Sequence, residues 1–141
     1  MGNKKVLRKF YDARAKSEQE KHLSYVHPDC TFQIIGTDKL GEFTKRWIGK
    51  EEIEKAATML FAAWDLSQLK IVTQHHSKDT IYVHRRGDVI FIPDGSRIED
   101  TQVVDKLTFK DDLIVEYLQF VDTFAVNEFM TKKNSKKKAT K

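Results

Sequence analysis

The feature that most constrains the fold is a series of strand-like segments in the second half of the chain. Four segments are rich in β-branched and aromatic side chains and are separated by short turns: residues 69–76, 80–92, 101–109 and 113–121. The strongest turn signal is Pro-Asp-Gly-Ser at residues 93–96. Strands joined this closely pair as antiparallel neighbours, so we predict a meander of long strands with a bulge at Gly87 and Asp88.

Two stretches of the first half carry the period of an amphipathic helix. In residues 5–16, Val6, Phe10 and Ala13 recur at intervals of three and four residues. In residues 50–64, the same spacing continues over three turns. We therefore predict two helices that each bury one face.

Shorter signals complete the order of elements. Residues 17–20 have a capping-box sequence, Ser-Glu-Gln-Glu, and predict the start of a short second helix. Residues 30–35 alternate polar and apolar side chains and predict the first strand, and Asp122 is placed to cap a short closing helix. Helices segregated from a run of strands indicate the α+β class, with the helices on one face of the sheet.

The net charge of +4 is distributed unevenly along the chain. Residues 132–141 contain six lysines and no acid, so residues 1–131 carry a net charge of −2. We predict one folded domain over residues 1–131 and a disordered lysine-rich tail over residues 132–141. Because the domain itself is mildly acidic, we expect no nucleic-acid binding except through this tail.

The chain carries no sequence signal for a membrane. No apolar run approaches the roughly 18–20 residues of a membrane span, so we expect no membrane partner. Cys30 is the only cysteine, which excludes an intrachain disulfide and fits a reducing compartment. We predict a cytoplasmic protein in which Cys30 is a small buried strand residue rather than a catalytic thiol.

The order of elements and four local sequences resemble the nuclear-transport-factor-2-like superfamily, which includes ketosteroid isomerases, limonene-epoxide hydrolases and SnoaL-like polyketide cyclases. The local sequences lie at residues 29–32, 47–49, 104–109 and 113–122. The resemblance implies a cystatin-like roll, in which a curved antiparallel sheet with helices on its concave face forms a cone-shaped pocket for a small apolar ligand. This fold serves many functions, so the activity depends on individual residues.

The resemblance aligns three catalytic positions of ketosteroid isomerases with this chain. The aspartate base falls on Ile34 and the oxyanion tyrosine falls on Phe10, and neither side chain performs that chemistry. The protonated aspartate that donates to the oxyanion is matched by Asp105. Because a donor without its base does not shuttle a proton, we do not expect ketosteroid isomerase activity.

The resemblance also aligns the catalytic residues of limonene-epoxide hydrolases, which use an arginine and two aspartates. Arg86 and Asp88 keep the Arg-x-Asp spacing, but the second acid falls on Gln119, and an amide does not ionise. We therefore do not expect epoxide hydrolase activity, and we favour a bulge or an exposed turn for residues 86–88.

Strand parity gives independent evidence about Asp105. The residues two before, two after and four after it are apolar and share its face of the strand, so Asp105 is predicted to point into the core. A carboxylate buried there is expected to take up a proton unless a cation pairs with it. With His84 or His75 as partner, Asp105 would supply the acid/base pair of a SnoaL-like cyclase; a purely structural role is equally open.

Other residues are predicted to line the pocket. From the matched positions we assign ligand contacts to six residues: Phe10, Phe32, Ile34, Trp47, Tyr117 and Gln119. Trp47 either covers the pocket or packs beneath it, and Tyr117 is either a ligand contact or a core aromatic. We expect surface positions for four histidines: His22, His27, His75 and His76. No metal-ligand spacing or cofactor motif is present, so we expect neither group.

Two functions remain open at this point. One is a small-molecule-binding domain that acts as an acid/base enzyme of the isomerase, cyclase or lyase type, with Asp105 and His84 as catalytic residues. The other is a non-catalytic binding or protein-interaction module that kept the fold and lost the chemistry. The losses at Phe10, Ile34 and Gln119 favour the second function, whereas an inward Asp105 favours the first.

The outer face of the sheet predicts a homodimer. Ile114, Leu118 and Phe120 are apolar and alternate away from the expected pocket face. A contiguous apolar patch of this kind is most often buried by symmetric pairing, and the resembled families also dimerise in this way. In the competing interpretation, the closing helix folds over the same face with Val126 and Phe129.

Overall fold

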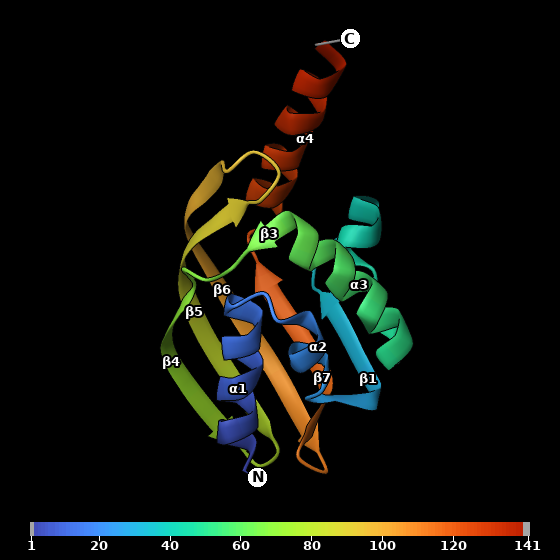
Figure 1. The fold of residues 1–141 in the computed structure, drawn as a ribbon, viewed down its shortest axis with the longest axis vertical. Helices are drawn as coiled ribbons and strands as arrows, with labels where there is room; N and C mark the ends of the chain where they lie inside the picture. Colours follow the sequence, from blue (N-terminus) through green and yellow to red (C-terminus); the bar gives the residue numbers. More distant parts are fainter. Residues whose placement is uncertain (1, 140–141) are drawn as a thin grey trace.

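The computed structural model describes residues 2–139, with side chains as far as Ser135. The elements follow in this order: α1 (Asn3–Ala15), α2 (Gln19–Leu23), β1 (Val26–Ile34), η1 (Asp38–Thr44), β2 (Trp47–Ile48), α3 (Lys50–Ala63), β3 (Trp64–Asp65), β4 (Lys70–Ser77), β5 (Thr80–Phe91), β6 (Arg97–Lys110), β7 (Leu113–Val121) and α4 (Thr123–Ala139). Figure 1 shows the sheet curled around α1, α2 and α3, with α4 projecting from the upper end. The predicted α+β class is confirmed.

The strands form one curled sheet. Their order is β2-β1-β7-β6-β5-β3, and β4 pairs with β5 beside this path. The meander from β4 to β7 is antiparallel, as predicted. β1 joins the other edge of β7 in a parallel pair, with Phe32 opposite Tyr117 and Ile34 opposite Gln119. This pair brings predicted pocket residues from distant parts of the chain side by side.

The core lies between the helices and the inner face of the sheet. α1 contributes the buried side chains of Val6, Leu7 and Phe10, and α3 contributes those of Ile53 and Ala57. Burial of a leucine or phenylalanine side chain stabilises the fold by about 1.5–3 kcal/mol relative to exposure. Both helices predicted from apolar periodicity are confirmed, and their buried faces form one wall of the interior.

The start of α2 differs from the predicted capping box. Ser17 lies just after the C-terminal end of α1 and has a φ of 58°. Its N–H donates to the Arg14 carbonyl at 3.2 Å, and the Glu18 N–H donates to the Ala13 carbonyl at 2.8 Å. These two hydrogen bonds form a Schellman motif. α2 therefore begins at Gln19, with Glu18 as its N-cap residue.

Register shifts interrupt the regular pairing in four strand pairs of the sheet, and two of them bear on the predictions. One lies between Gly87 and Val89 of β5, as predicted, although the extra residue belongs to β6. The other shifts the pairing of β6 with β7 between Thr108 and Phe109. As a result, Ile114 is fully buried, and its assignment to the outer face is wrong. A bulge breaks the strict alternation on which that assignment depended.

The closing helix begins as predicted but extends further. The Asp122 carboxylate accepts a hydrogen bond from the Ala125 N–H at 2.9 Å and caps α4. Of the predicted disordered tail, residues 132–139 are helical, and the last two residues lie outside the described part of the chain. Lysine is a good helix former, and Lys133 pairs with Asp94 of the β5–β6 turn, which ties this part of the helix to the sheet.

Candidate ligand-binding site

A cavity of about 130 Å³ lies between the helices and the inner face of the sheet. One water molecule needs about 10–15 Å³ on this scale, so the cavity has room for a small organic compound. Its walls come from α1, α2, α3, β1 and the strands β5 to β7, and most of the lining side chains are apolar. Five of the six predicted ligand contacts line it: Phe10, Phe32, Ile34, Tyr117 and Gln119.

Trp47, the sixth predicted contact, does not belong to the cavity wall. It lies in β2 opposite Phe32 and is buried in the core. The Lys45 ammonium lies 4.3 Å from the centre of its ring, in cation–π geometry. Of the two placements that the sequence left open, the structure shows packing in the core and no cover over the cavity.

Asp105 points inward, as strand parity predicts, and is fully buried behind the cavity wall. Its Oδ2 accepts a hydrogen bond from the Tyr11 hydroxyl at 2.6 Å and pairs with Arg85 Nη2 at 2.8 Å. Its Oδ1 accepts a hydrogen bond from Gln119 Nε2 at 3.2 Å. Arg85 therefore supplies a cation in direct contact with the Asp105 carboxylate.

Arg85 places this positive charge in the core. It lies on β5 at the same parity as Ile81 and Val83, and only 4 % of its surface is exposed. Burial lowers the pKa of Arg85, but the charge of the Asp105 carboxylate raises it by more. The pKa is therefore raised overall, and the guanidinium stays charged. Its central carbon lies 4.4 Å from the centre of the Tyr11 ring.

Tyr11 and Tyr117 keep their hydroxyl protons at neutral pH. Burial, and then the charge of Asp105, raises the pKa of each tyrosine above its ordinary value. The Tyr117 hydroxyl oxygen accepts a hydrogen bond from Gln119 Nε2 at 3.2 Å. The wall therefore presents two neutral hydroxyls, an amide and a guanidinium, arranged around one buried carboxylate.

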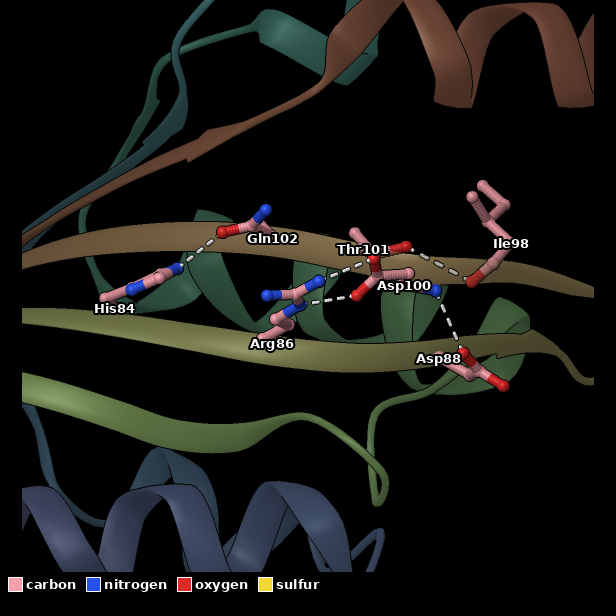
Figure 2. A network of polar contacts seen from close by, with 7 residues as sticks. All are labelled: His84, Arg86, Asp88, Ile98, Asp100, Thr101 and Gln102. Atoms are coloured by element: carbon pink, nitrogen blue, oxygen red, sulfur yellow. Dashed lines mark hydrogen bonds and ion pairs between the residues drawn. The ribbon is translucent and has the colours of Figure 1, made fainter.

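His84 lies on the other face of the sheet. Figure 2 shows its ring beside Gln102 on the neighbouring strand, and its Nε2 lies 2.9 Å from Gln102 Oε1. Alternate residues of a strand point to opposite faces, so the structure does not bring His84 to Asp105, and the predicted acid/base pair does not form. His75, the other predicted partner, is exposed on β4.

Arg86 and Asp88 also lie outside the cavity. Arg86 donates two hydrogen bonds to Asp100, at 2.5 and 2.8 Å, and Asp88 accepts one from the Asp100 N–H at 2.9 Å (Figure 2). Asp88 also pairs with Arg97 at 3.0 Å. These side chains hold the irregular part of the β5–β6 hairpin together, which confirms the predicted bulge and excludes an Arg-x-Asp pair facing a ligand.

His22 lines the cavity, so its predicted surface position is wrong. Its ring stacks on Phe10 with a centre-to-centre distance of 3.8 Å, and its Nδ1 lies 3.1 Å from the Phe10 carbonyl oxygen. Because a carbonyl only accepts, Nδ1 carries the hydrogen and Nε2 is unprotonated. Burial lowers the pKa of His22 to about 4, so the ring is neutral at pH 7.

Arg14 is a second buried arginine in the cavity wall. Its Nη2 donates hydrogen bonds to the carbonyl oxygens of Leu60 at 3.3 Å and Trp64 at 3.0 Å, at the C-terminal end of α3. Its central carbon lies 4.2 Å from the centre of the Phe61 ring. Burial lowers the pKa of Arg14 to about 10, so it remains charged at neutral pH.

Three polar residues of the cavity wall were not predicted: Arg14, Arg85 and His22. Two of them do carry a local signal in the sequence. Arg14 follows Phe10 by four residues and therefore shares its face of α1, and Arg85 follows Val83 by two residues and shares its face of β5. His22 had no local signal, because its place depends on how α2 folds back against α1.

The described residues offer little chemistry outside this polar cluster. Among their side chains, no group of three or more His, Cys, Asp or Glu could hold a metal ion. None of the helices in residues 2–139 is long and apolar enough to cross a membrane. Cys30 is buried, as predicted, and burial raises the pKa of its thiol to about 12, which makes it a poor nucleophile.

Comparison with protein families places the chain in one of them. Residues 7–117 match the family model of the SnoaL-like domain, which accounts for most of the chain. The chain belongs to the SnoaL-like domain family. The matched segment of this SnoaL-like domain runs from α1 into β7 and contains both Asp105 and Arg85. No curated protein sequence matches it significantly.

Solved structures share the fold of this SnoaL-like domain over nearly its full length. A nuclear-transport-factor-2-like protein from Burkholderia thailandensis is 18% identical with a TM-score of 0.75, and the alignment covers 92% of this chain and 98% of that one. TerC, crystallised with polyporic acid, is 18% identical with a TM-score of 0.74 and coverages of 89% and 95%. An epoxide hydrolase of the limonene-epoxide-hydrolase type from M. tuberculosis is 13% identical with a TM-score of 0.69 and coverages of 88% and 85%. At these identities, the likeness establishes the fold alone.

Proposed function

We propose that this SnoaL-like domain binds a small, mainly apolar molecule in its cavity and holds the polar end of that molecule against the cluster around Asp105. One observation carries the proposal: an otherwise apolar wall contains Tyr11, Arg85, Tyr117 and Gln119, all connected to one buried carboxylate. A few fixed polar groups on an apolar wall are the usual means by which a protein orients a ligand.

Asp105 acts in this proposal as a positioning residue. Its two oxygens already accept from Tyr11, Arg85 and Gln119, and it does not line the cavity. A carboxylate engaged in this way fixes the orientation of its partners, which then meet the ligand. The catalytic role that the sequence suggested for Asp105 and His84 has no support from this geometry.

A larger side chain that fills the cavity tests whether the ligand binds there. Ala57 lies on α3 and lines the cavity, whereas Ala62 is exposed on the same helix. In an NMR titration with benzamide, we expect Ala57→Met to weaken binding at least tenfold and Ala62→Met to leave it unchanged. Unfolding temperatures of both variants confirm that they are folded. Equal binding by native protein and Ala57→Met would refute the proposal.

Proton transfer to or from the bound molecule is a second candidate function, and His22 is the observation that favours it. Its unprotonated Nε2 belongs to a neutral ring on the cavity wall, and the free lone pair of a neutral imidazole accepts a proton. We expect the protein to accelerate hydrogen–deuterium exchange at the methyl group of acetophenone in heavy water, and His22→Gln to abolish the acceleration. An exchange rate equal to that of buffer would remove this candidate. Ketosteroid isomerisation remains unexpected, because Ile34 lines the cavity where that base would stand.

Location and assembly are also proposals. A free, buried cysteine is compatible with a reducing compartment, and the cytoplasm remains our proposed location. A homodimer formed through the outer face of the sheet remains our proposed assembly.

A further inference from the structure

Two buried arginines and one buried aspartate face the interior of this domain. Arg85 and Asp105 form an ion pair at 2.8 Å, so their charges compensate each other. Arg14 has no such partner: among the described side chains it forms no ion pair. The carboxylate of Asp65 acts on the Arg14 charge only from beyond ion-pair distance, and it accepts a hydrogen bond from the Ser67 N–H at 2.8 Å. The cavity wall therefore carries one positive charge that no acidic side chain contacts directly.

The guanidinium of Arg14 is also incompletely hydrogen-bonded. Its Nη2 donates hydrogen bonds to carbonyl oxygens at the end of α3, but within the described residues its buried Nη1 has no hydrogen-bond partner. Only 8 % of Arg14 is exposed, and the residue lines the cavity. A buried donor left without an acceptor destabilises the folded protein, and it does so more strongly when it is charged. An acceptor supplied by a ligand would remove this destabilisation.

The remaining polar groups of the wall do not add negative charge. His22 is neutral at pH 7, and Tyr11 and Tyr117 keep their protons. Gln119 is an amide. The net charge of the polar wall is consequently +1 at neutral pH, in an apolar enclosure where an anion gains more from a cation than it does in water.

We infer that the ligand of this cavity is an anion, namely an apolar ring-sized compound with one carboxylate or equivalent acidic oxygen, and that Arg14 Nη1 binds that oxygen. The inference rests on the proposed function and specifies its ligand class. It also explains why a guanidinium stands at this position, since a second donor can meet the ligand while the first holds α3.

The test compares three one-ring probes that differ in charge: benzoate, benzamide and benzylamine. Affinities are measured by NMR titration at pH 7 and constant salt for native protein, Arg14→Gln and Arg8→Gln. Arg8 is exposed on the same helix, so Arg8→Gln makes the same change of net charge away from the cavity. We expect native protein and Arg8→Gln to bind benzoate at least tenfold more tightly than benzamide, with benzylamine weakest. We expect the preference to fall below threefold in Arg14→Gln.

A purely structural role for Arg14 predicts a different result. In that case Arg14→Gln would be less stable but would keep whatever preference the native protein has. Arg14→Lys retains the charge and is expected to keep part of the preference, which makes the comparison informative even if Arg14→Gln fails to fold. Equal binding of benzoate and benzamide by native protein would overturn this inference and leave the proposed function standing. Binding of none of the probes would overturn both.

Discussion

At the scale of single residues, the most consequential feature is the carboxylate of Asp105. It is fully buried and is held by three donors, of which Arg85 is also buried. The two charges are compatible with the interior only as a pair, since removal of one partner leaves the other without compensation. Asp105 therefore links the stability of the fold to the arrangement of the cavity wall.

Asp105→Asn is expected to lower the free energy of unfolding by about 3–5 kcal/mol, because it leaves the Arg85 guanidinium buried without a counter-charge. The double variant Asp105→Leu with Arg85→Met removes both charges and is expected to regain most of that loss. Urea unfolding of the three proteins measures these differences. A loss below about 1 kcal/mol for Asp105→Asn would show that Arg85 finds another partner or reaches solvent.

His22 makes stability depend on pH. In the unfolded chain, this histidine takes up a proton near pH 6.5, whereas in the folded protein it does so only near pH 4. Proton uptake below pH 6.5 therefore favours the unfolded state, and stability falls as the pH is lowered from about 6.5 to about 4, by up to about 3 kcal/mol. We expect His22→Gln to remove most of this slope and His75→Gln, at an exposed position, to leave it intact. An equal slope in native protein and His22→Gln would contradict this account.

Strand parity and helical spacing explain which site residues the sequence revealed. Asp105 was placed inward because its strand neighbours are apolar, and that reasoning needs no knowledge of other strands. The role of Arg85 depends on which face of β5 points inward, and the bulge beside Gly87 obscured this in the sequence. Arg14 shares the buried face of α1 with Phe10, which helical spacing indicates, whereas His22 acquires its surroundings from Phe10 of α1 and Phe61 of α3, so no local pattern identified it.

At the scale of elements, the β5–β6 hairpin is shaped by a close approach of the backbone at Gly87. A Cβ atom at this position would lie 2.0 Å from the Gln68 carbonyl oxygen, and Gly87 has a φ of +156°. Gly95 of the same hairpin also has a positive φ, of +73°, but a Cβ there would meet no atom within 4 Å. A substitution at Gly95 therefore tests the effect of the backbone conformation alone, whereas one at Gly87 also tests the effect of contact with the Gln68 backbone.

We expect Gly95→Ala to lower the free energy of unfolding by about 1–2 kcal/mol, the usual cost of a left-handed conformation for a residue with a side chain. Gly87→Ala adds a clash with the backbone of Gln68, and we expect it to cost at least about 3 kcal/mol. Chemical denaturation of both variants gives the comparison. Equal losses would mean that the segment around Gln68 moves away freely.

The order of helices and strands could largely be predicted from periodicity and turn signals. The errors lie where one local signal competes with another: Ser17 has the sequence of an N-cap but closes α1, and Ile114 has the parity of an outer residue but is separated from Leu118 and Phe120 by a bulge. The parallel pairing of β1 with β7 joins segments far apart in the chain, and no local pattern encodes such a contact.

At the scale of the whole molecule, the outer face of the sheet remains apolar in part. Val104 and Phe120 are neighbours across β6 and β7, and 40 % and 45 % of their surfaces are exposed. The competing cover by the closing helix finds no support in its contacts, because Phe129 packs against Trp64 and Phe91 at ring-centre distances of 5.6 and 5.8 Å.

Light scattering at micromolar concentration is therefore expected to give a mass near twice the 16.5 kDa of one chain. Phe120→Lys places a charge on the apolar outer face and is expected to shift the protein to the mass of one chain. Phe124→Lys makes the same change on α4, at a side chain that is also exposed, and is expected to have no effect. A native mass near 16.5 kDa would rule out the dimer.

The central claim is that a ligand enters the interior of the curled sheet and not its outer face. Val103 and Val104 test it directly, because these adjacent valines of β6 lie on opposite faces, the first buried in the cavity wall and the second exposed. In methyl-labelled protein saturated with benzoate, we predict nuclear Overhauser effects from the ring protons of the probe to the methyl groups of Val103 and Ile34, and none to those of Val104. Effects to Val104 without effects to Val103 and Ile34 would contradict the account.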